Sequence, residues 1–434
     1  MSMSGWARLR KQVVHPLTGI VNDLTELQVN PGDPDLHFFA AQLPDLEQWL
    51  GFSYLERSSA AGRTREEAIA ATLGEGIERY AGAACLQETG DLVWAPWNSL
   101  RDAAVDPRRF ALYAPEQYTS RWPFSPATVD QPMRWALGYS LTRKCEVLVP
   151  AQFAYLPYQG APGEPILAMH TSTGTACGET FHQAVLSGLC EVIERDAFMM
   201  HWLGRLPAPK VDITADPDLV GEVKRRYDRP GIRYHLLDFT TDIGVPTYFC
   251  AVVEEGSQNT ALAVGAATRT TGTAAARKAL MESVQTRVWL RQMAKSEGLR
   301  RFDSFSDVHS FEDHVNLWGS HEMLPHADFL LNSERTSPLR NQCPVSDPPG
   351  QVDWVVDRLS QRGLEAIIVD ITPSDIRSLG LTVVRAIVPG AIPLSADHRF
   401  EPLGGERLYT VPALLGYGGP RTLADFNPVP HPFP

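Results

Sequence analysis

The chain has 434 residues, of which 44% are hydrophobic and 21% charged, and this composition is typical of globular proteins and excludes the disordered and collagen-like classes. Its formal net charge is −12 without a basic block, which argues against nucleic-acid binding because phosphate neutralisation requires clustered Lys and Arg. No segment reaches the ~18 uninterrupted apolar residues of a transmembrane helix, and the N-terminus lacks the apolar run of a signal peptide, so we expect a cytoplasmic protein without membrane contact.

The first half of the chain is expected to alternate irregular stretches with two long helices. Residues up to 45 are loop-rich. Thr64 followed by Glu67 is a capping-box pattern, and it predicts a helix over about 64–85. Two further elements are expected here: a pair of short strands around a polar turn at 134–151, and a second helix at about 180–203.

The second half brings strands, a third helix and an irregular region. Alternating apolar residues predict strands over 233–255 and 260–267, followed by a helix at about 273–297. Residues 303–350 are rich in Ser, Asp, His and Pro and are expected to be irregular, with short helices. Three elements follow: a helix at 353–362 and strands at 365–370 and 383–388. Because no clean βαβ rhythm emerges, we expect an α/β or α+β fold with mixed sheets.

The predicted helices share a pattern of charged residues. The pattern E-x-x-E-R occurs twice, as Glu75-Gly-Ile-Glu78-Arg79 and as Glu191-Val-Ile-Glu194-Arg195. The third helix carries a related pattern, Glu282-Ser-Val-Gln285-Thr-Arg287. Positions i, i+3 and i+4 share one face of a helix, so each set projects together. The flanking residues are apolar or small, which predicts helices that are buried over most of their circumference.

Buried carboxylates are unfavourable unless they are paired or bound to a cation. One Arg cannot neutralise two Glu, so a divalent cation would complete each set. Mg²⁺ binds carboxylate oxygens and keeps water and phosphate oxygens among its other ligands. The pattern therefore predicts a nucleotide held through magnesium. No P-loop and no Rossmann glycine motif offers a competing nucleotide site. The alternative reading is an ion-pair stripe on a solvated helix face.

At these residues the chain resembles the YcaO family, from about His15 to the C-terminus. The blocks that match in order are Thr18-Gly19-Ile20, residues 62–80, 172–178, 191–196 with Trp202, 237–238 with 242–244, 279–287, 370–372, 388–390, and 403–405 with 407–409. The resemblance implies a YcaO-type fold, with mixed sheets and buried helices around an ATP and magnesium site. It also implies an N-terminal extension (1–14), one catalytic domain (15–427) and a Pro-rich tail (428–434).

The resemblance further implies the roles of individual residues. The implied Mg²⁺ ligands are Glu75, Glu78, Glu191, Glu194 and Glu282. The implied ATP contacts are Arg63, Glu75, Arg79, Glu191, Glu282, Gln285, Arg385 and Arg407, and a salt-bridge role is the alternative for Arg385 and Arg407. Arg195 and Arg287 are implied catalytic residues. The chain departs from the family pattern at Ala71, where a Ser is usual, and at Thr173, where an Asn is usual.

The tail indicates a subtype, because azoline-forming members of the family resemble its P-x-P-x-P end. Proline fixes φ, so a segment with Pro430, Pro432 and Pro434 is stiff and could place the terminal carboxylate of Pro434 in the active site as a base. A disordered Pro-rich end is the alternative. The remaining candidates for proton transfer are expected to be structural or exposed: His170, His182, His201 and His398.

The resemblance implies an ATP-dependent cyclodehydratase that converts Cys, Ser or Thr of a ribosomal precursor peptide into thiazoline or oxazoline rings. Thioamide formation, amidine formation and a non-catalytic docking scaffold are the alternatives. The implied partners are a leader-bearing precursor, a separate ubiquitin-activating-enzyme-like or ThiF-like protein that binds the leader, a flavin dehydrogenase and a second copy in a homodimer. The precursor, the modified residues and the final product are beyond what the sequence specifies.

Overall fold

The computed structural model describes residues 3–30, 32–90, 92–257, 260–296, 298–341, 343–418 and 422–434. The chain forms two compact units, each built from separated segments. The first unit contains Met1–Leu27, His37–Val192 and Val345–Ala391, and the second contains Gln28–Leu36, Ile193–Pro344 and Ile392–Pro434. No helix in the described part of the chain combines the length and apolarity needed to cross a bilayer.

The first unit contains two sheets among its described residues. One is antiparallel with the order β1 (Asp23–Glu26), β2 (His37–Gln42), β3 (Arg57–Gly62). The other has the order β4 (Val93–Ala95), β5 (Met133–Ser140), β13 (Ile367–Asp370), β14 (Thr382–Ile387), β7 (Thr175–Gly178), with β6 (Cys145–Pro150) paired to β5. The helices of this unit are α1 (Met3–Val13), α2 (Glu47–Leu50), α3 (Arg65–Glu88), α4 (Trp97–Leu100), α5 (Ala151–Ala154), α11 (Pro348–Ser360) and α12 (Ser374–Ser378).

The second unit is built on one five-stranded sheet among its described residues. The strand order is β11 (Leu262–Thr268), β10 (Thr247–Glu254), β9 (Ile232–Asp238), β8 (Lys210–Asp212), β12 (Thr336–Pro338), in which only the pair β8–β12 is parallel. Its helices are α7 (Pro217–Arg226), α8 (Gly272–Ser296), α9 (Phe311–Leu317), α10 (Asp328–Leu331) and α13 (Glu406–Leu414). Helix α6 (Phe181–Leu203) begins in the first unit and ends in the second.

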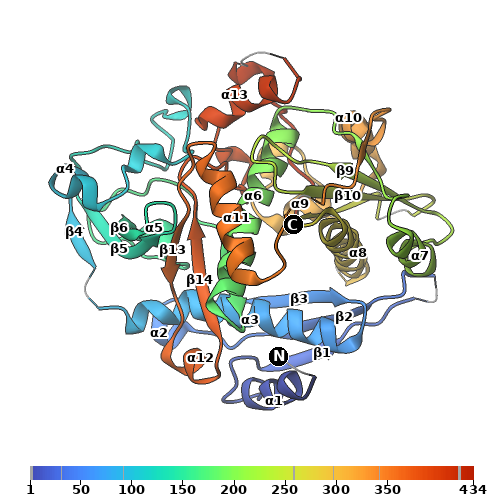
Figure 1. The fold of residues 1–434 in the computed structure, drawn as a ribbon, viewed down its shortest axis with the longest axis horizontal. Coiled ribbons are helices and arrows are strands. Elements are labelled where there is room, and N and C mark those ends of the chain that lie inside the picture. The colour runs from blue at the N-terminus through green and yellow to red at the C-terminus, as the bar shows by residue number, and fades with distance from the viewer. Residues whose placement is uncertain are drawn as a thin grey trace. The chain divides into compact units, whose positions relative to one another are not determined.

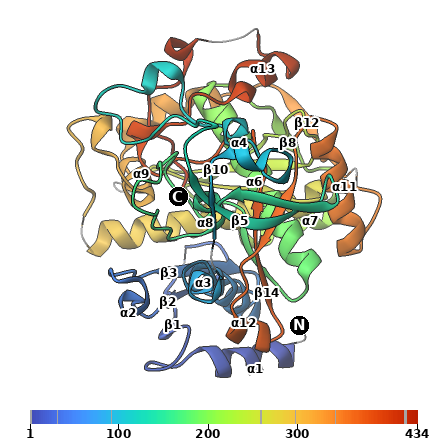
Figure 2. The same ribbon diagram turned by 90° about the vertical axis from the view of Figure 1, so that its left-hand side faces the viewer.

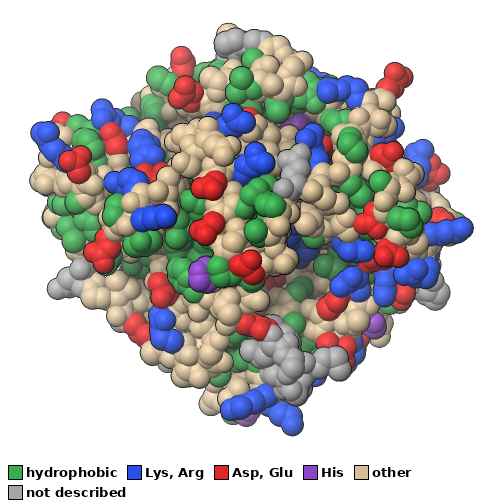
Figure 3. Space-filling model, viewed as in Figure 1, with side chains coloured by type: hydrophobic (Ala, Val, Ile, Leu, Met, Phe, Trp, Pro, Cys, Tyr) green, Lys and Arg blue, Asp and Glu red, His purple; other side chains and the backbone are tan. Residues whose placement is uncertain are grey.

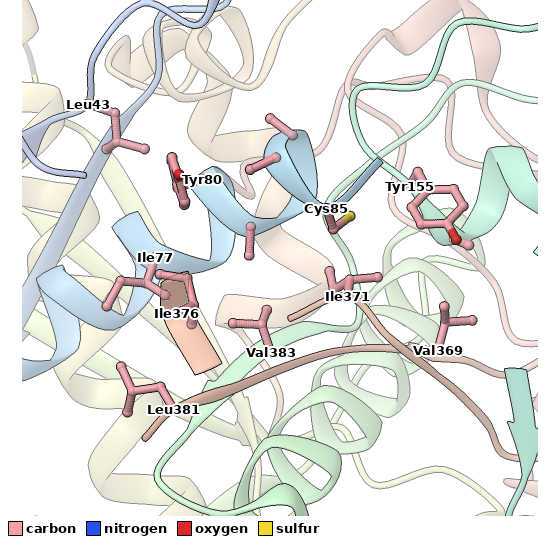
Figure 4. Close-up of a cluster of buried hydrophobic side chains, with 14 of the residues drawn as sticks. Leu43, Ile77, Tyr80, Cys85, Tyr155, Val369, Ile371, Ile376, Leu381 and Val383 are labelled. Atoms are coloured by element: carbon pink, nitrogen blue, oxygen red, sulfur yellow. The ribbon is translucent and has the colours of Figure 1, made fainter. Parts of the chain in front are cut away.

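Helix α3 is the buried helix around which the first unit packs. It lies along the sheet β1–β2–β3 in both ribbon views (Figure 1, Figure 2). On another side, Ile77 and Cys85 face Ile376, Val383 and Ile371 in one apolar cluster (Figure 4). This packing explains how a helix that carries Glu75, Glu78 and Arg79 remains stable, because its apolar residues are removed from water on several sides.

The expected mixed α/β fold is confirmed, and so are the three long helices. The N-terminal expectation was wrong, because residues up to 45 contain α1, β1 and β2. The sequence of β3, Arg57-Ser-Ser-Ala-Ala-Gly62, has weak strand propensity. The conformation of β3 is decided by its pairing with β2 and its packing against α3. The local sequence pattern of β3 does not indicate either contact. On the face drawn in Figure 3, Lys and Arg are interspersed with Asp and Glu, as expected for a chain without a basic block.

The predicted N-cap of α3 gives a stability test. The Thr64 side chain accepts a hydrogen bond from the Glu67 backbone N–H at 3.1 Å, and the helix begins at Arg65. Thr64→Ala is expected to lower the free energy of unfolding by about 1 kcal/mol, because an N–H of the first turn loses its acceptor. Denaturant unfolding monitored by circular dichroism would measure this loss. The exposed loop residue Thr128 is the control, since Thr128→Ala is expected to stay within about 0.5 kcal/mol. Equal effects at both positions would contradict the capping role.

Candidate functional site

The first E-x-x-E-R set lies on one face of α3. Glu75 accepts a hydrogen bond from the Ser59 backbone N–H at 3.0 Å, which ties the helix to β3. Arg79 pairs with Glu75 at 2.9 Å and with Glu56 at 2.7 Å. These side chains are each about one-third exposed, so a ligand could reach them. The opposite charge of the two carboxylates outweighs the burial of Arg79, so its pKa is raised.

Glu78 is the carboxylate of this set that most needs a positive partner. The Cys177 backbone N–H donates to it at 2.7 Å. Burial raises the pKa of Glu78 to about 8, and the charges of Glu191 and Glu75 add to the rise against the effect of that hydrogen bond. At neutral pH the group therefore takes up a proton unless a cation is present. Its chemistry fits a magnesium ligand, because a divalent cation would stabilise the ionised Glu78 carboxylate in place of the proton.

Glu191 belongs to the same cluster. It accepts a hydrogen bond from the Gly174 backbone N–H at 3.2 Å. Gly174 has φ +88°, and a Cβ there would lie 2.2 Å from the Ala386 carbonyl oxygen, so only glycine permits this loop to close on β14. The loop thereby fixes the direction of the Glu191 carboxylate.

Arg385, on β14, is buried beside this loop. It donates to the carbonyl oxygens of Phe153 and Thr171 and to Thr175 Oγ1. Burial lowers its pKa to about 10, and the attraction of Glu191 opposes this change. The structure thus brings Glu75, Glu78, Arg79, Glu191 and Arg385 together in the first unit. Arg63 is exposed and pairs with Glu67 at 2.8 Å.

The second half of α6 presents Glu194 and Arg195 in the second unit. Glu194 is 5% exposed and accepts a hydrogen bond from the Thr268 backbone N–H at 3.0 Å, at the end of β11. Arg195 donates to the other oxygen of the same carboxylate. Its guanidinium also lies 4.3 Å from the ring centroid of Phe433, which belongs to the C-terminal tail.

Helix α8 carries the third predicted set. Glu282 forms an ion pair with Lys278 at 2.9 Å, one turn earlier. Gly265 of β11 lets α8 approach closely, because a Cβ there would lie 2.3 Å from the Ser283 backbone nitrogen. Gln285 lies one turn beyond Glu282 on the same helix.

Arg287, also on α8, forms ion pairs with residues outside its own sequence pattern. It donates to Asp33 and to Glu254, each at 2.8 Å, and Arg291 pairs with the same Asp33. Burial opposes the charge of Asp33, but the hydrogen bonds from Arg291 and Arg287 outweigh it and lower its pKa to about 2. Asp33 is a residue that the sequence pattern did not indicate.

The depressed pKa of Asp33 predicts a pH-dependent stability. The stabilisation is present above the unfolded pKa of 3.8 and is lost as the pH falls through about 2. Asp33→Asn is therefore expected to lower the unfolding free energy at neutral pH, and the difference from the unmodified chain is expected to shrink as the pH falls below 3.8. Urea unfolding at a series of pH values would measure it. A difference that does not change with pH would contradict this role of the ion-pair cluster.

Arg407 of α13 is part of a second buried network. It donates to both carboxylate oxygens of Asp196, at 2.9 and 2.8 Å, and to Asp242 at 2.7 Å. Asp196 also accepts the Ile392 backbone N–H at 2.9 Å and is 0% exposed. These contacts match the salt-bridge alternative that the sequence left open for Arg407. Asp196 directly follows the second E-x-x-E-R set in an apolar helix, and a further charge at that position was the available signal of its role.

The Pro-rich tail is ordered and buried, which excludes a disordered end for the described residues. Val429, His431 and Phe433 are 6%, 0% and 2% exposed. Phe433 contacts the ring of Phe198 at 4.7 Å in addition to Arg195. Pro434 directly follows Phe433 in the sequence, and Phe433 contacts Arg195 of the Glu194–Arg195 pair.

The four histidines considered from the sequence differ in their surroundings. His201 is 2% exposed, bonded to the Ala197 carbonyl and stacked on Phe239, which is a structural role. His182 is exposed. Nε2 of His170 is buried without a hydrogen-bond partner among the described residues. His398 donates to the carbonyl of Pro428.

Among the residues that the structure describes, no three His, Cys, Asp or Glu side chains converge on a common metal position. The clusters instead offer a few carboxylates each. This fits a cation that takes most of its ligands from phosphate and water.

A family model described as "YcaO cyclodehydratase, ATP-ad Mg2+-binding" matches residues 59–392. The chain belongs to the YcaO family, as the resemblance implied.

Two curated relatives are uncharacterised proteins. One lies in the tfuA 3′ region of Rhizobium leguminosarum bv. trifolii and is 30% identical over 337 residues, which cover 74% of each chain. The other comes from Methanothermobacter thermautotrophicus and is 27% identical over 343 residues, which cover 77% of this chain and 82% of the relative. Neither relative carries a described activity.

Solved structures share the fold. A heterocyclase in complex with substrate and cofactor has a TM-score of 0.80 at 24% identity. The match covers 100% of this chain and 57% of the heterocyclase. The heterocyclase TruD has a TM-score of 0.65 at 25% identity, over 84% of this chain and 50% of that one. YcaO from Methanopyrus kandleri, bound with AMPPCP and Mg²⁺, has a TM-score of 0.60 at 18% identity over 89% of each chain. The chain spans about half the length of the two heterocyclases.

Proposed function

We propose that this YcaO protein is an ATP- and Mg²⁺-dependent cyclodehydratase that closes Cys, Ser or Thr residues of a ribosomal precursor peptide into azoline rings. The observation that carries the proposal is the cluster of Glu75, Glu78 and Glu191, whose Glu78 has a pKa raised to about 8. A carboxyl group with that pKa is protonated at neutral pH unless a bound cation takes the place of the proton. The Mg²⁺-bound nucleotide of a structural relative supports the same assignment.

The proposed magnesium ligands are Glu75, Glu78 and Glu191 in the first unit and Glu194 and Glu282 in the second. Arg63, Arg79, Gln285 and Arg385 remain predicted nucleotide contacts, and Arg195 and Arg287 remain predicted catalytic residues. For Arg407, which was also a predicted nucleotide contact, the ion pairs with Asp196 and Asp242 favour the salt-bridge alternative. Residues 15–427 remain the predicted catalytic domain.

The proposed reaction activates a backbone amide. The substrate thiol or hydroxyl adds to the preceding carbonyl carbon, and the new C–S or C–O bond leaves the former carbonyl oxygen as a poor leaving group. ATP supplies the γ-phosphoryl group that this oxygen takes, so that the carbon–oxygen bond breaks and phosphate departs as the C=N bond forms. Arg195 would neutralise charge that develops on the transferred group.

A base must take the proton of the nucleophile. The predicted base is the Pro434 carboxylate, one residue beyond Phe433, and the contact of Phe433 with Arg195 supports this position of the tail. The proposed partners are a leader-bearing precursor, a separate ubiquitin-activating-enzyme-like or ThiF-like protein, a flavin dehydrogenase and a second copy of the chain. A neighbouring structure, the microcin synthetase McbBCD complex with pro-MccB17 bound, is consistent with a multiprotein assembly.

An isotope experiment tests the chemistry. A precursor whose backbone carbonyl carries a heavy oxygen isotope is incubated with the protein, its partner, ATP and Mg²⁺. The label is expected in the released phosphate, because the amide oxygen leaves with the phosphoryl group. Modified peptide with unlabelled phosphate would overturn the proposed activation. ATP turnover without modification of the peptide would also overturn it.

A further inference from the structure

The tail has an unusual requirement for hydrogen-bond donors. Proline occupies every second position from Pro428 to Pro434, and proline has no backbone N–H. The edge of the segment that carries the prolines therefore cannot donate to a neighbouring strand, yet the buried carbonyl oxygens of the segment need donors. Side chains of neighbouring elements can provide those donors.

Four successive carbonyl oxygens of the tail each accept a bond from a ring N–H. The donors are His398 Nε2 to Pro428 at 3.0 Å, Trp202 Nε1 to Val429 at 2.9 Å, Trp318 Nε1 to Pro430 at 2.9 Å and His314 Nδ1 to His431 at 2.7 Å. They come from η6 (His398–Phe400), α6, the C-cap of α9 and α9 itself. In both ribbon views the C-terminus lies next to α9 (Figure 1, Figure 2). We call these four side chains the tail groove.

His431 fixes the register of the tail within the groove. Its Nε2–H donates to the Ser395 carbonyl at 2.8 Å, and its Nδ1 accepts the Phe433 backbone N–H at 3.2 Å. Its ring stacks on that of His314, with 3.8 Å between the ring centroids and an angle of 7° between the ring planes. One ring nitrogen of His431 thus donates and the other accepts, which is the arrangement of a neutral imidazole. Two residues further on, Phe433 lies against Arg195.

Indole N–H groups that bond to the carbonyls of an extended Pro-rich chain, beside stacked rings, are the contacts by which aromatic grooves bind polyproline ligands. We infer that residues 428–434 are a polyproline-like ligand bound in cis, and that the tail groove is a peptide-binding site whose four side chains are positioning residues for Phe433 and Pro434. The inference rests on the proposed function, because the positioned residues are the ones assigned to the reaction.

A binding experiment without ATP or precursor tests the site itself. The probe is a fluorescent peptide with the sequence of residues 428–434, and the receptor is the chain ending at Asn427. The peptide is expected to bind this receptor and not the full chain, whose groove is occupied. Trp318→Phe in the receptor is expected to weaken binding about five-fold, because one hydrogen bond is lost while the aromatic packing stays. Trp97→Phe is the matched control, since Trp97 Nε1 donates to the Ala104 carbonyl within the first unit, whereas the tail belongs to the second.

A folded receptor that does not bind the peptide, or a full chain that binds it equally well, would overturn the inference. If the shortened chain does not fold, hydrogen exchange of the Phe433 backbone amide in variants of the full chain tests the inference instead. Exchange is expected to be faster in Trp318→Phe and unchanged in Trp97→Phe, and equal rates in both variants would overturn the inference.

Turnover then tests the positioning role. The shortened chain is expected to lose azoline formation and to recover it when the peptide is added, whereas a scrambled peptide of the same composition restores nothing. If the peptide binds but restores nothing while the full chain is active, the positioning role is wrong and the proposed function stands. An inactive full chain instead counts against the proposed function and leaves the binding result intact.

Discussion

Glu191→Gln is expected to lower ATP-dependent turnover by at least about 100-fold while the protein stays folded. The amide oxygen of Gln can still accept the Gly174 backbone N–H, so the loop that holds this side chain is retained. The change removes one negative charge from the cluster of Glu75, Glu78 and Glu191. A cation bound there would lose part of its stabilisation, and the nucleotide would lose its correct position.

Steady-state kinetics and nucleotide titration of the same preparation would measure this effect. The control is Glu334→Gln, at an exposed glutamate in the second unit, which is expected to leave both quantities unchanged. Wild-type turnover in Glu191→Gln would show that this carboxylate is not part of the site. Lost turnover together with lost helical structure would assign it a structural role.

Arg407→Ala is expected to lower the unfolding free energy by about 3–5 kcal/mol, because it leaves buried Asp196 and Asp242 without their cation. The Arg407 side chain is 9% exposed, and those of the two carboxylates are 0% and 8% exposed. Their attraction outweighs the burial of the guanidinium and raises the pKa of Arg407. The loss is expected without any nucleotide, because the network contains only protein groups.

Thermal and urea unfolding of the ligand-free protein would measure this loss. The control is Arg233→Ala, which breaks an exposed ion pair with Glu255 in the same unit and is expected to change stability by less than about 1 kcal/mol. An Arg407→Ala variant with unchanged stability and lost ATP affinity would contradict the network and assign Arg407 to the nucleotide.

The sequence predicts the long helices because their apolar residues recur with helical spacing and α3 has a capping Thr64. It also predicts Glu75, Glu78, Glu191 and Glu194 as carboxylates that need a partner, since charge in an apolar helix is unfavourable. Of these, Glu194 is buried, whereas Glu75 stays about one-third exposed. The strands before α3 were missed because β3 is rich in Ser and Ala and is decided by tertiary pairing.

Long-range partners account for the rest of what was missed. Arg407 meets Asp196 across 211 residues of sequence, and Trp318 meets Pro430 across 112. No local spacing rule connects such positions, although each partner has a buried polar group that must be satisfied. An aspartate in an apolar helix, or a proline-rich end, indicates that a partner is needed but does not identify that partner.

The central claim is tested most directly by the mass of a precursor peptide after incubation with this protein, its leader-binding partner, ATP and Mg²⁺. The account predicts loss of one water for each modified residue, strictly dependent on ATP, with a Cys, Ser or Thr side chain consumed. Loss of water with an amine consumed would indicate amidine formation, and exchange of oxygen for sulfur with a sulfur donor would indicate a thioamide. An unchanged mass with a verified partner and leader, with and without a sulfur donor, would contradict an enzymatic role and leave the docking scaffold.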